Sequence, residues 1–142
     1  MCGIVGFASK KADYDKQAVL KEMMDRIAHR GPDGEGSYLD EGVALGHRRL
    51  SIIDLQGGAQ PMYNEDGSMV VIFNGEIYNF QELKAQLEEK GHVFATRSDT
   101  EVLLHGYEEW GKGMLNRLRG MFAFVIWDKK KETLFGARDF FG

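Results

Sequence analysis

A continuous apolar run near the end of the chain constrains the fold more than any other feature. The stretch from Phe122 to Trp127 reads FAFVIW, and a charged turn separates it from a second β-forming stretch, Thr133 to Ala137. A half-exposed strand alternates apolar and polar residues, whereas a strand that is apolar on both faces belongs to a sheet covered on both sides. We therefore expect a hairpin in a sheet that lies between two other layers.

The rest of the pattern predicts an α+β domain. The 142 residues, 43% of them hydrophobic, suffice for one domain with its own core, and no linker or repeat divides them. Further strands are predicted over Gly3 to Ala8, Gly36 to Leu39, Val43 to His47, Leu50 to Ile53 and Met69 to Phe73. Helices are predicted along the apolar stripe from Val19 to Ile27, from a capping box at Asn79 and Glu82 to Lys90, and from a capping box at Ser98 and Glu101 through Trp110.

Charge and composition exclude several classes of function. The chain carries 18 Lys and Arg against 22 Asp and Glu, a formal charge of -4, without a basic cluster, so neither nucleic acid nor a membrane is a predicted partner. No apolar run has the length of a bilayer span, and a single cysteine allows no internal disulfide, so we expect a cytoplasmic protein. The four histidines, His29, His47, His92 and His105, lack the spacing of metal ligands, and we predict no metal and no cofactor for these residues.

The only cysteine follows the initiator methionine. Because Cys2 is small, removal of Met1 is expected, and the mature Cys2 then carries a thiol and a free α-amine on one residue. Their reference pKa values, about 8.5 and about 7.7–8.0, suit a nucleophile and a base that act together near neutral pH. The alternative is a small buried hydrophobe in a strand, which is the commoner role of a free cysteine.

The pair Asn74-Gly75 ends the apolar stretch that begins at Met69. Asn-Gly is the commonest two-residue hairpin turn, and this is the first interpretation. Only three residues separate the pair from the helix start predicted at Asn79, which leaves no room for a second strand. The other interpretation makes the Asn74 amide and the Gly75 N–H donors to an oxyanion, with the missing Cβ of Gly75 giving a reacting carbonyl room to approach.

Two further charged residues form a candidate binding pair. Arg49 and Asp99 each occur where solvated charges are common, at a strand end and a helix start. Taken together, they predict a clamp for an amino-acid zwitterion, because an arginine can hold a carboxylate through two hydrogen bonds and an aspartate can accept from an ammonium group.

These residues belong to blocks that resemble one known family. The blocks run from Cys2 to Gly6, His29 to Asp33, Arg49 to Asp54, Gln60 to Pro61, Asn74 to Asn79, Ser98 to Glu101, Gly120 to Phe124 and Arg138 to Asp139. In this order they are similar to the glutaminase domain of the glutamine-hydrolysing asparagine synthetases, one branch of the class II glutamine amidotransferases.

The resemblance implies a fold and a role for each matching residue. The expected fold is a four-layer αββα Ntn-hydrolase sandwich with two antiparallel sheets, of which residues 1–142 would be a glutaminase domain that is incomplete at its C-terminal end. Cys2 would be the nucleophile, and Asn74 and Gly75 would form the oxyanion hole. The residues implied to bind L-glutamine are Arg49, Leu50, Ser51, Ile52, Ile53, Asn74, Gly75, Glu76 and Asp99.

The resemblance also implies partners outside these residues. A synthetase domain in cis would use ATP and magnesium, and the full-length protein could form a homodimer. Two alternatives stay open. One is the glutaminase domain of another class II amidotransferase with a different acceptor, and the other is a catalytically silent module for glutamine sensing or subunit contacts.

Overall fold

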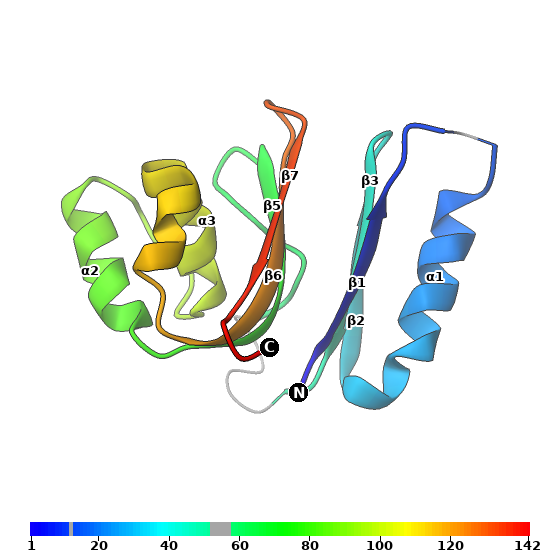
Figure 1. The fold of residues 1–142 in the computed structure, drawn as a ribbon, viewed down its shortest axis with the longest axis horizontal. Coiled ribbons are helices and arrows are strands. Elements are labelled where there is room, and N and C mark those ends of the chain that lie inside the picture. The colour runs from blue at the N-terminus through cyan, green and yellow to red at the C-terminus, as the bar shows by residue number, and fades with distance from the viewer. Residues whose placement is uncertain (12, 52–57) are drawn as a thin grey trace.

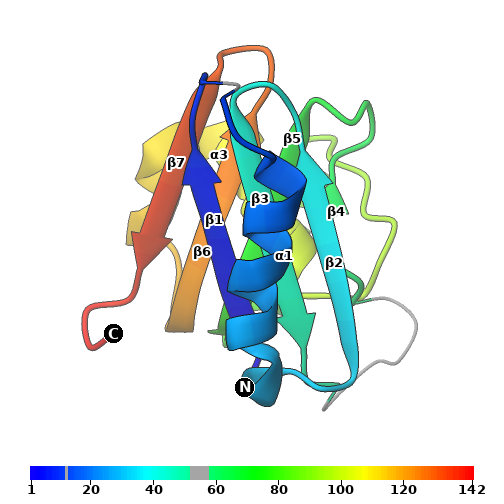
Figure 2. The same cartoon turned by 90° about the vertical axis from the view of Figure 1, so that its right-hand side faces the viewer.

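Four layers make up the molecule, as Figure 1 shows for the computed structural model, which describes residues 1–11, 13–51 and 58–142. The outer layer on one side is helix α1 (Lys16–Arg26), which covers the antiparallel sheet β1 (Gly3–Ala8), β3 (Val43–Arg49) and β2 (Gly34–Leu39), in that order. Figure 2 looks onto this helix and its sheet. The second antiparallel sheet has the order β4 (Met62–Tyr63), β5 (Met69–Ile77), β6 (Gly120–Asp128) and β7 (Thr133–Arg138). Helices α2 (Phe80–Glu89) and α3 (Thr100–Trp110) form the other outer layer, and the short 3-10 turns are Ala28–Arg30 and Gly111–Asn116.

The apolar run from Phe122 to Trp127 lies where its pattern predicted. It forms most of β6, a central strand of the second sheet, with β7 as its hairpin partner. Phe124 and Ile126 pack toward α2 and α3, while Val125 and Trp127 pack toward the first sheet. The predicted sheet with two covered faces, and with it the αββα arrangement, is confirmed.

Each interlayer space has its own apolar core. The largest lies between the second sheet and its helices and includes Phe73, Leu83, Leu103 and Phe124. A smaller core between the sheets contains Val43, Leu45, Val70, Ile72 and Trp127. The third, under α1, contains only Leu20, Met24 and Ala44 as buried members. The inter-sheet core occupies only part of the gap, which leaves one end of the sandwich open for polar side chains.

The structure corrects two predictions about strand ends. Strand β5 continues through Asn74 and Gly75, which lie opposite Ala123 and Phe122 of β6, so the hairpin-turn interpretation of this pair is wrong. The strand predicted over Leu50 to Ile53 is wrong at its start, because β3 ends at Arg49 and neither Leu50 nor Ser51 is in a strand. Ile52 and Ile53 lie outside the described residues.

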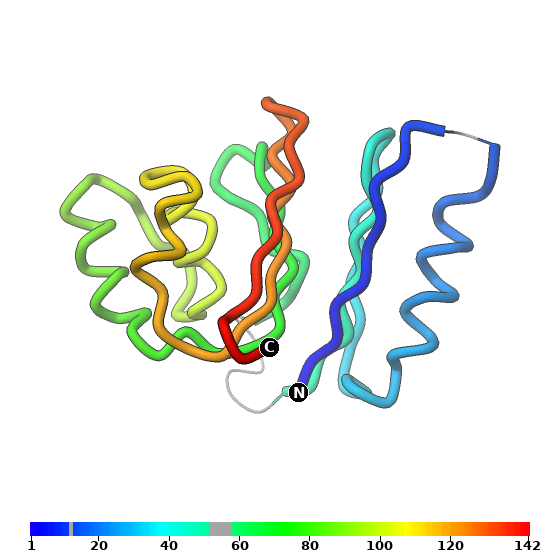
Figure 3. Tube along the Cα trace, viewed as in Figure 1, coloured from blue at the N-terminus to red at the C-terminus, as the bar shows by residue number. Residues whose placement is uncertain are grey.

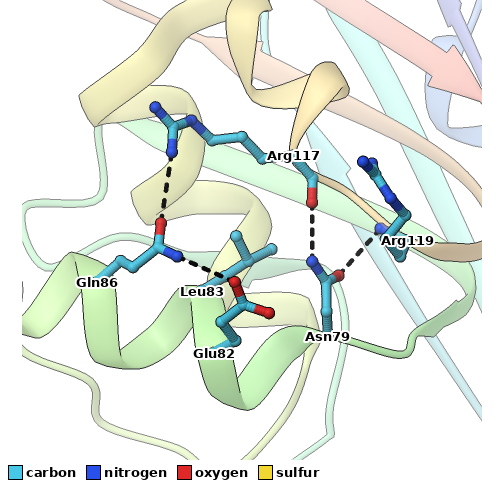
Figure 4. A pocket seen from close by; sticks show the side chains of 6 residues that line it. All are labelled: Asn79, Glu82, Leu83, Gln86, Arg117 and Arg119. Carbon is cyan, nitrogen blue, oxygen red and sulfur yellow. Dashed lines mark hydrogen bonds between the residues drawn. The ribbon is translucent and has the colours of Figure 1, made fainter.

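The capping box predicted at Asn79 does not form. The Asn79 side chain instead joins two backbone groups beyond the turn Gly111–Asn116: it donates to the Arg117 carbonyl at 2.8 Å and accepts from the Arg119 N–H at 2.9 Å. Figure 4 shows these bonds beside a hollow of about 270 Å³ that is lined by α2 and by Arg117 and Arg119 of the segment that enters β6. Asn79 therefore ties the start of α2 to the chain that enters β6.

The capping box predicted at Ser98 and Glu101 does not form either. Helix α3 begins at Thr100, with Asp99 as the residue before its first turn. The Glu101 carboxylate accepts from the Ala95 and Thr96 N–H groups, at 2.8 and 2.7 Å, and not from Ser98. Glu101 therefore fixes the loop that leads into Asp99.

Candidate active site

An open cleft of about 810 Å³ occupies the end of the gap between the two sheets. Strand alternation explains which side chains reach it. Val43 and Leu45 of β3 face the inter-sheet core, so His47 and Arg49, farther along the same face, project into the gap beyond it. The two chain ends also lie at this end of the sandwich, as the trace in Figure 3 shows. The cleft is thus built from both sheets at the point where apolar packing stops.

The second sheet contributes to the cleft by the same alternation. Val70 and Ile72 of β5 face the first sheet, so Asn74 and Glu76 are next on that face, and both line the cleft. Asp99 lines it from the start of α3. The structure therefore brings together residues that lie far apart in the sequence.

Cys2 directly precedes β1, and its partly buried side chain lines the cleft. Its Sγ accepts a hydrogen bond from the Leu50 N–H at 3.4 Å, and its carbonyl accepts from Arg30 Nε at 3.2 Å. The thiol is thus held by the segment that follows β3 and is not packed in a core. The interpretation of Cys2 as a buried strand hydrophobe is wrong, and its role as nucleophile stays a prediction.

The Gly75 N–H belongs to the edge of β5 that faces away from β6. Successive N–H groups of a strand point to opposite edges, so Phe73, Gly75 and Ile77 direct theirs to the same edge. On that edge, the Phe73 N–H donates to Gln60 Oε1 at 2.6 Å and the Ile77 N–H donates to Asp99 Oδ2 at 2.9 Å. The Gly75 N–H lies between these two, in the segment that lines the cleft.

Glycine is required at this position for a reason that the sequence did not show. Gly75 has φ of 145°, and a Cβ there would lie 2.0 Å from the carbonyl oxygen of Met121 in β6. The missing side chain therefore makes room for the neighbouring strand, in addition to any room it gives a ligand. Asn74 and Gly75 both line the cleft, and their role as oxyanion donors stays a prediction.

Asp99 has the electrostatics of a cation site. Burial is the main effect that raises the pKa of its carboxyl group, the hydrogen bond from the Ile77 N–H opposes this effect, and the nearby Glu76 carboxylate adds to it. A buried carboxylate beside a second negative charge is stabilised by an ammonium group placed between them. Asp99 and Glu76 are therefore a suitable pair for an α-ammonium group.

Asp33, in the block His29 to Asp33, holds the segment after Arg49 through hydrogen bonds. The Asp33 N–H donates to the Arg49 carbonyl at 3.0 Å, and Asp33 Oδ2 accepts from the Ser51 N–H at 2.7 Å. Arg49 and Leu50 line the cleft, but Ser51 is not among its lining residues. Asp33 already accepts from the Ser51 N–H, and the role of Ser51 as a glutamine contact stays a prediction.

Sequence reasoning missed two residues that bind the backbone of β5 at Phe73, next to Asn74. Gln60 binds the Phe73 N–H, and the ring of His47 hydrogen-bonds the Phe73 backbone. Burial is the main effect that lowers the His47 pKa, to about 4; the bond to Phe73 opposes it, and the Arg49 charge adds to it. His47 is therefore neutral at physiological pH. The spacing of His47 two residues before Arg49 indicated a shared face, but nothing in the sequence indicated the contact with β5.

The histidines are less scattered than the sequence suggested. His92 and His105 have ring centroids 5.1 Å apart, and their nitrogens lie within 4.8 Å of each other and of a Glu108 oxygen. The two histidines are 13 positions apart in the numbering, a spacing that did not indicate this contact, and the absence of a metal stays a prediction.

No helix in the described part of the chain is long and apolar enough to cross a membrane.

Comparison with known proteins agrees with this architecture. The chain is 50% identical over its whole length to asparagine synthetase [glutamine-hydrolyzing] 1 of Bacillus subtilis, and 46% identical to asparagine synthetase [glutamine-hydrolyzing] 2 of Oryza sativa, and it spans 23% and 24% of those proteins. Among solved structures, the glutamine phosphoribosylpyrophosphate amidotransferase of B. subtilis matches 71% of this chain and 24% of its own length, with a TM-score of 0.56 and 31% identity. A model of the glutamine amidotransferase domain matches residues 1–142. The chain is a member of the glutamine amidotransferase domain family, with an Ntn-hydrolase fold and its greatest likeness among these relatives to the asparagine synthetases.

Proposed function

We propose that the cleft hydrolyses the side-chain amide of L-glutamine and releases glutamate and ammonia. One observation carries the proposal: the nucleophile candidate Cys2 lies in the same cleft as the Asn74 and Gly75 donors and the charged residues suited to a zwitterion. These groups come from both sheets and from the start of α3, and all of them line this one cleft.

The reaction uses these groups in a fixed order. The α-amine of the mature Cys2 accepts the thiol proton as the Cys2 sulfur attacks the amide carbon of glutamine, and the negative charge that forms on the oxygen is stabilised by the Asn74 amide and the Gly75 N–H. Collapse of this intermediate breaks the carbon–nitrogen bond, and the nitrogen leaves as ammonia after receiving a proton from the α-ammonium group of the mature Cys2. Water then cleaves the γ-glutamyl thioester, which gives glutamate and restores the thiol.

The zwitterionic end of glutamine fixes its orientation. Arg49 binds the α-carboxylate through its two parallel donors, and Asp99 with Glu76 binds the α-ammonium group. Leu50 adds its backbone at the cleft wall. Both charged ends of the substrate are held, so only the side-chain amide extends toward Cys2.

Processing of Met1 is part of the proposal. With Met1 present, the α-amine belongs to that residue, which is 60% exposed at the cleft. Removal of Met1 places the amine on Cys2 itself, where it can exchange protons with the sulfur and the leaving nitrogen. A tag that cannot be removed from the N-terminus should therefore abolish glutaminase activity and leave the melting temperature unchanged.

The test combines intact mass with ammonia release from glutamine. The processed protein should lack Met1 and release ammonia, and Cys2→Ala should lose nearly all of this activity while it still binds glutamine. Turnover by Cys2→Ala close to that of the parent would contradict the mechanism. Glutamine binding without ammonia release by the processed parent would favour the catalytically silent module.

For the acceptor, the relatives favour aspartate. The proteins at 50% and 46% identity are glutamine-hydrolysing asparagine synthetases, and the chain spans about a quarter of their length. The ammonia would pass to an activated aspartate in a synthetase domain joined in cis, where ATP and magnesium act. The groups in the cleft bind glutamine in this proposal, and ATP would bind only to the synthetase domain. Asparagine formation from glutamine, aspartate and ATP by the full-length protein tests this step. Transfer of the ammonia to phosphoribosylpyrophosphate instead would favour the alternative of another class II amidotransferase with a different acceptor. Light scattering of the full-length protein tests whether it forms a homodimer.

A further inference from the structure

A cluster of acceptor atoms lies on α3 away from the cleft. His105 and Glu108 project from the second half of α3, and His92 comes from the loop after α2. His92 Nδ1 and His105 Nδ1 lie 3.4 and 3.5 Å from the same oxygen, Glu108 Oε2. We infer that these three atoms form a binding site for one divalent transition-metal ion of the Zn²⁺ type, independent of the reaction proposed above.

The hydrogen bonds of the two rings orient the free nitrogens toward each other. His92 Nε2 lies 2.9 Å from Glu109 Oε2, and His105 Nε2 lies 3.3 Å from Glu101 Oε1. Carboxylate oxygens only accept, so each Nε2 carries the hydrogen, and in the neutral ring Nδ1 is then an acceptor. In the neutral rings both Nδ1 lone pairs therefore face the Glu108 carboxylate, and in the part of the chain that the structure describes no lysine or arginine forms an ion pair with that carboxylate.

The environment of His105 makes this arrangement unfavourable without a cation. The residue is 1% exposed, and among the described residues its Nδ1 has no hydrogen-bond partner. The Glu65 carboxylate lies on the same side, with Oε1 3.8 Å from this nitrogen. A buried acceptor that faces two carboxylates costs free energy, and a bound cation removes that cost.

The spacing and the outer contacts fit a tetrahedral ion. With metal–ligand bonds of about 2.0–2.1 Å, neighbouring ligands in a tetrahedron are about 3.3 Å apart, close to the two nitrogen–oxygen distances here. Histidine ligands usually donate their second nitrogen to a carboxylate, as His92 does to Glu109 and His105 to Glu101. Two imidazoles with one carboxylate favour Zn²⁺ over Mg²⁺ or Ca²⁺, which prefer oxygen ligands. Glu65, exposed in the turn before β5, or a water would be the fourth ligand.

The site would brace the loop that leads to the cleft. Residues 92–99 connect His92 to Asp99, and Glu101, the partner of His105, also holds Ala95 and Thr96 in this loop. An ion on His92 and His105 therefore fixes both ends of a segment that carries Asp99. Its expected effects are a higher melting temperature and a lower KM for glutamine, with no change in the chemistry at Cys2.

The test is a titration of the full-length, tag-free protein with ZnCl2 against a chromophoric chelator. It is done in a Cys2→Ser background, because the thiol at the cleft is a competing zinc ligand. We expect one equivalent of Zn²⁺ to be lost in His92→Ala, and at least about tenfold weaker binding in Glu108→Gln and in the outer-contact variant Glu109→Gln. The matched control Glu89→Gln, on the exposed face of α2, should bind as the parent does.

Two results would overturn the inference. One is unchanged zinc stoichiometry and affinity in both His92→Ala and Glu108→Gln, which would place the bound ion elsewhere. The other is an absence of zinc binding at micromolar concentration, together with NMR spectra that show protons on both nitrogens of His92 or His105. In that case a proton, and not a metal ion, bridges the cluster.

Discussion

The two edges of strand β5 differ in how their backbone groups are paired. Along one edge, β5 pairs with β6 over its full length, from Met69 opposite Asp128 to Ile77 opposite Gly120. Along the other edge, β4 is only two residues long and pairs with Val70 and Val71. Beyond β4, side chains replace the missing strand, since Gln60 binds the Phe73 N–H and Asp99 binds the Ile77 N–H.

This difference explains where the cleft forms. A paired edge has no backbone donors left for a ligand, whereas an edge satisfied by separate side chains can leave one N–H between them for a substrate. At β5 that N–H belongs to Gly75, beside the Asn74 side chain. The paired edge supplies rigidity, the open edge supplies the Gly75 N–H, and the face of β5 toward the first sheet supplies the Asn74 amide, the second proposed oxyanion donor.

The largest effect is expected at Asn74, whose side chain lines the cleft next to Gly75 of the open edge. Removing one oxyanion donor typically costs about 2.7–4 kcal/mol of transition-state stabilisation, so Asn74→Ala should lose roughly 10²–10³-fold in kcat with a smaller change in KM. Asn74→Asp should lose at least as much, because it places a negative charge beside the developing oxyanion. Steady-state ammonia release measures both.

The fold of these variants must be checked separately. Circular dichroism and melting temperature should stay close to the parent, and Asn116→Ala, at an exposed asparagine outside the cleft, should keep full activity. A folded Asn74→Ala whose kcat is within about threefold of the parent would remove this residue from the catalytic machinery.

A smaller effect is expected at Gln60, whose side chain lines the cleft and binds the Phe73 N–H, next to Asn74 in β5. Gln60→Ala leaves the Phe73 N–H without its acceptor, which should cost about 1–3 kcal/mol of folding stability. If the shift of β5 also displaces Asn74 and Gly75 and raises the activation free energy by about 1.4 kcal/mol, kcat would fall about tenfold. Gln60→Glu keeps an acceptor oxygen and should recover most of the kcat.

Chemical denaturation and kcat together decide the role of Gln60. The matched control is Gln81→Ala, at an exposed position of α2, which should change neither quantity. Loss of stability without loss of kcat would make Gln60 a structural residue only and would weaken the contrast between the two edges.

The strands and their faces were largely predictable from local pattern. The run FAFVIW indicated a central strand with two covered faces, and β1 was predicted with its observed bounds. What failed was the placement of polar side chains. Asn79 and Glu101 matched the capping pattern, but tertiary contacts with Arg119 and Ala95 provided better partners than the local backbone.

The site divides in the same way. Asn74 and Gly75 stood out because too few residues follow them for a hairpin, and this argument needed only the sequence. The roles of Gln60 and His47 could not be predicted, since each contacts Phe73 from a different strand or loop. Likewise, only the packing of the α2–α3 loop on α3 brings His92 to His105. Ile52 and Ile53, implied as glutamine contacts, lie outside the described residues, and their roles stay predictions.

The smallest of the three effects concerns the charge of Asp99, the second side chain on the open edge. Its pKa in the free protein is raised, chiefly by burial, so the folded state binds a proton more tightly than the unfolded chain does. The protonated carboxyl thus contributes stability that is present below the ordinary pKa and is lost as pH rises through the raised one. At neutral pH, Asp99→Asn should therefore be at least as stable as the parent, while it binds glutamine more weakly.

The same shift predicts how glutamine binding depends on pH. The ammonium group needs ionised Asp99, so KM should rise as the pH falls toward the raised pKa of this carboxyl group, with a limit of about tenfold per pH unit below it. Because binding favours the ionised form, proton release should accompany it in this range, measurable by calorimetry in buffers of different ionisation enthalpy. In Asp99→Asn the KM should be higher than in the parent and nearly independent of pH. An equal pH dependence in parent and variant would assign the titration to another group, and Glu76→Gln would then test the neighbouring carboxylate.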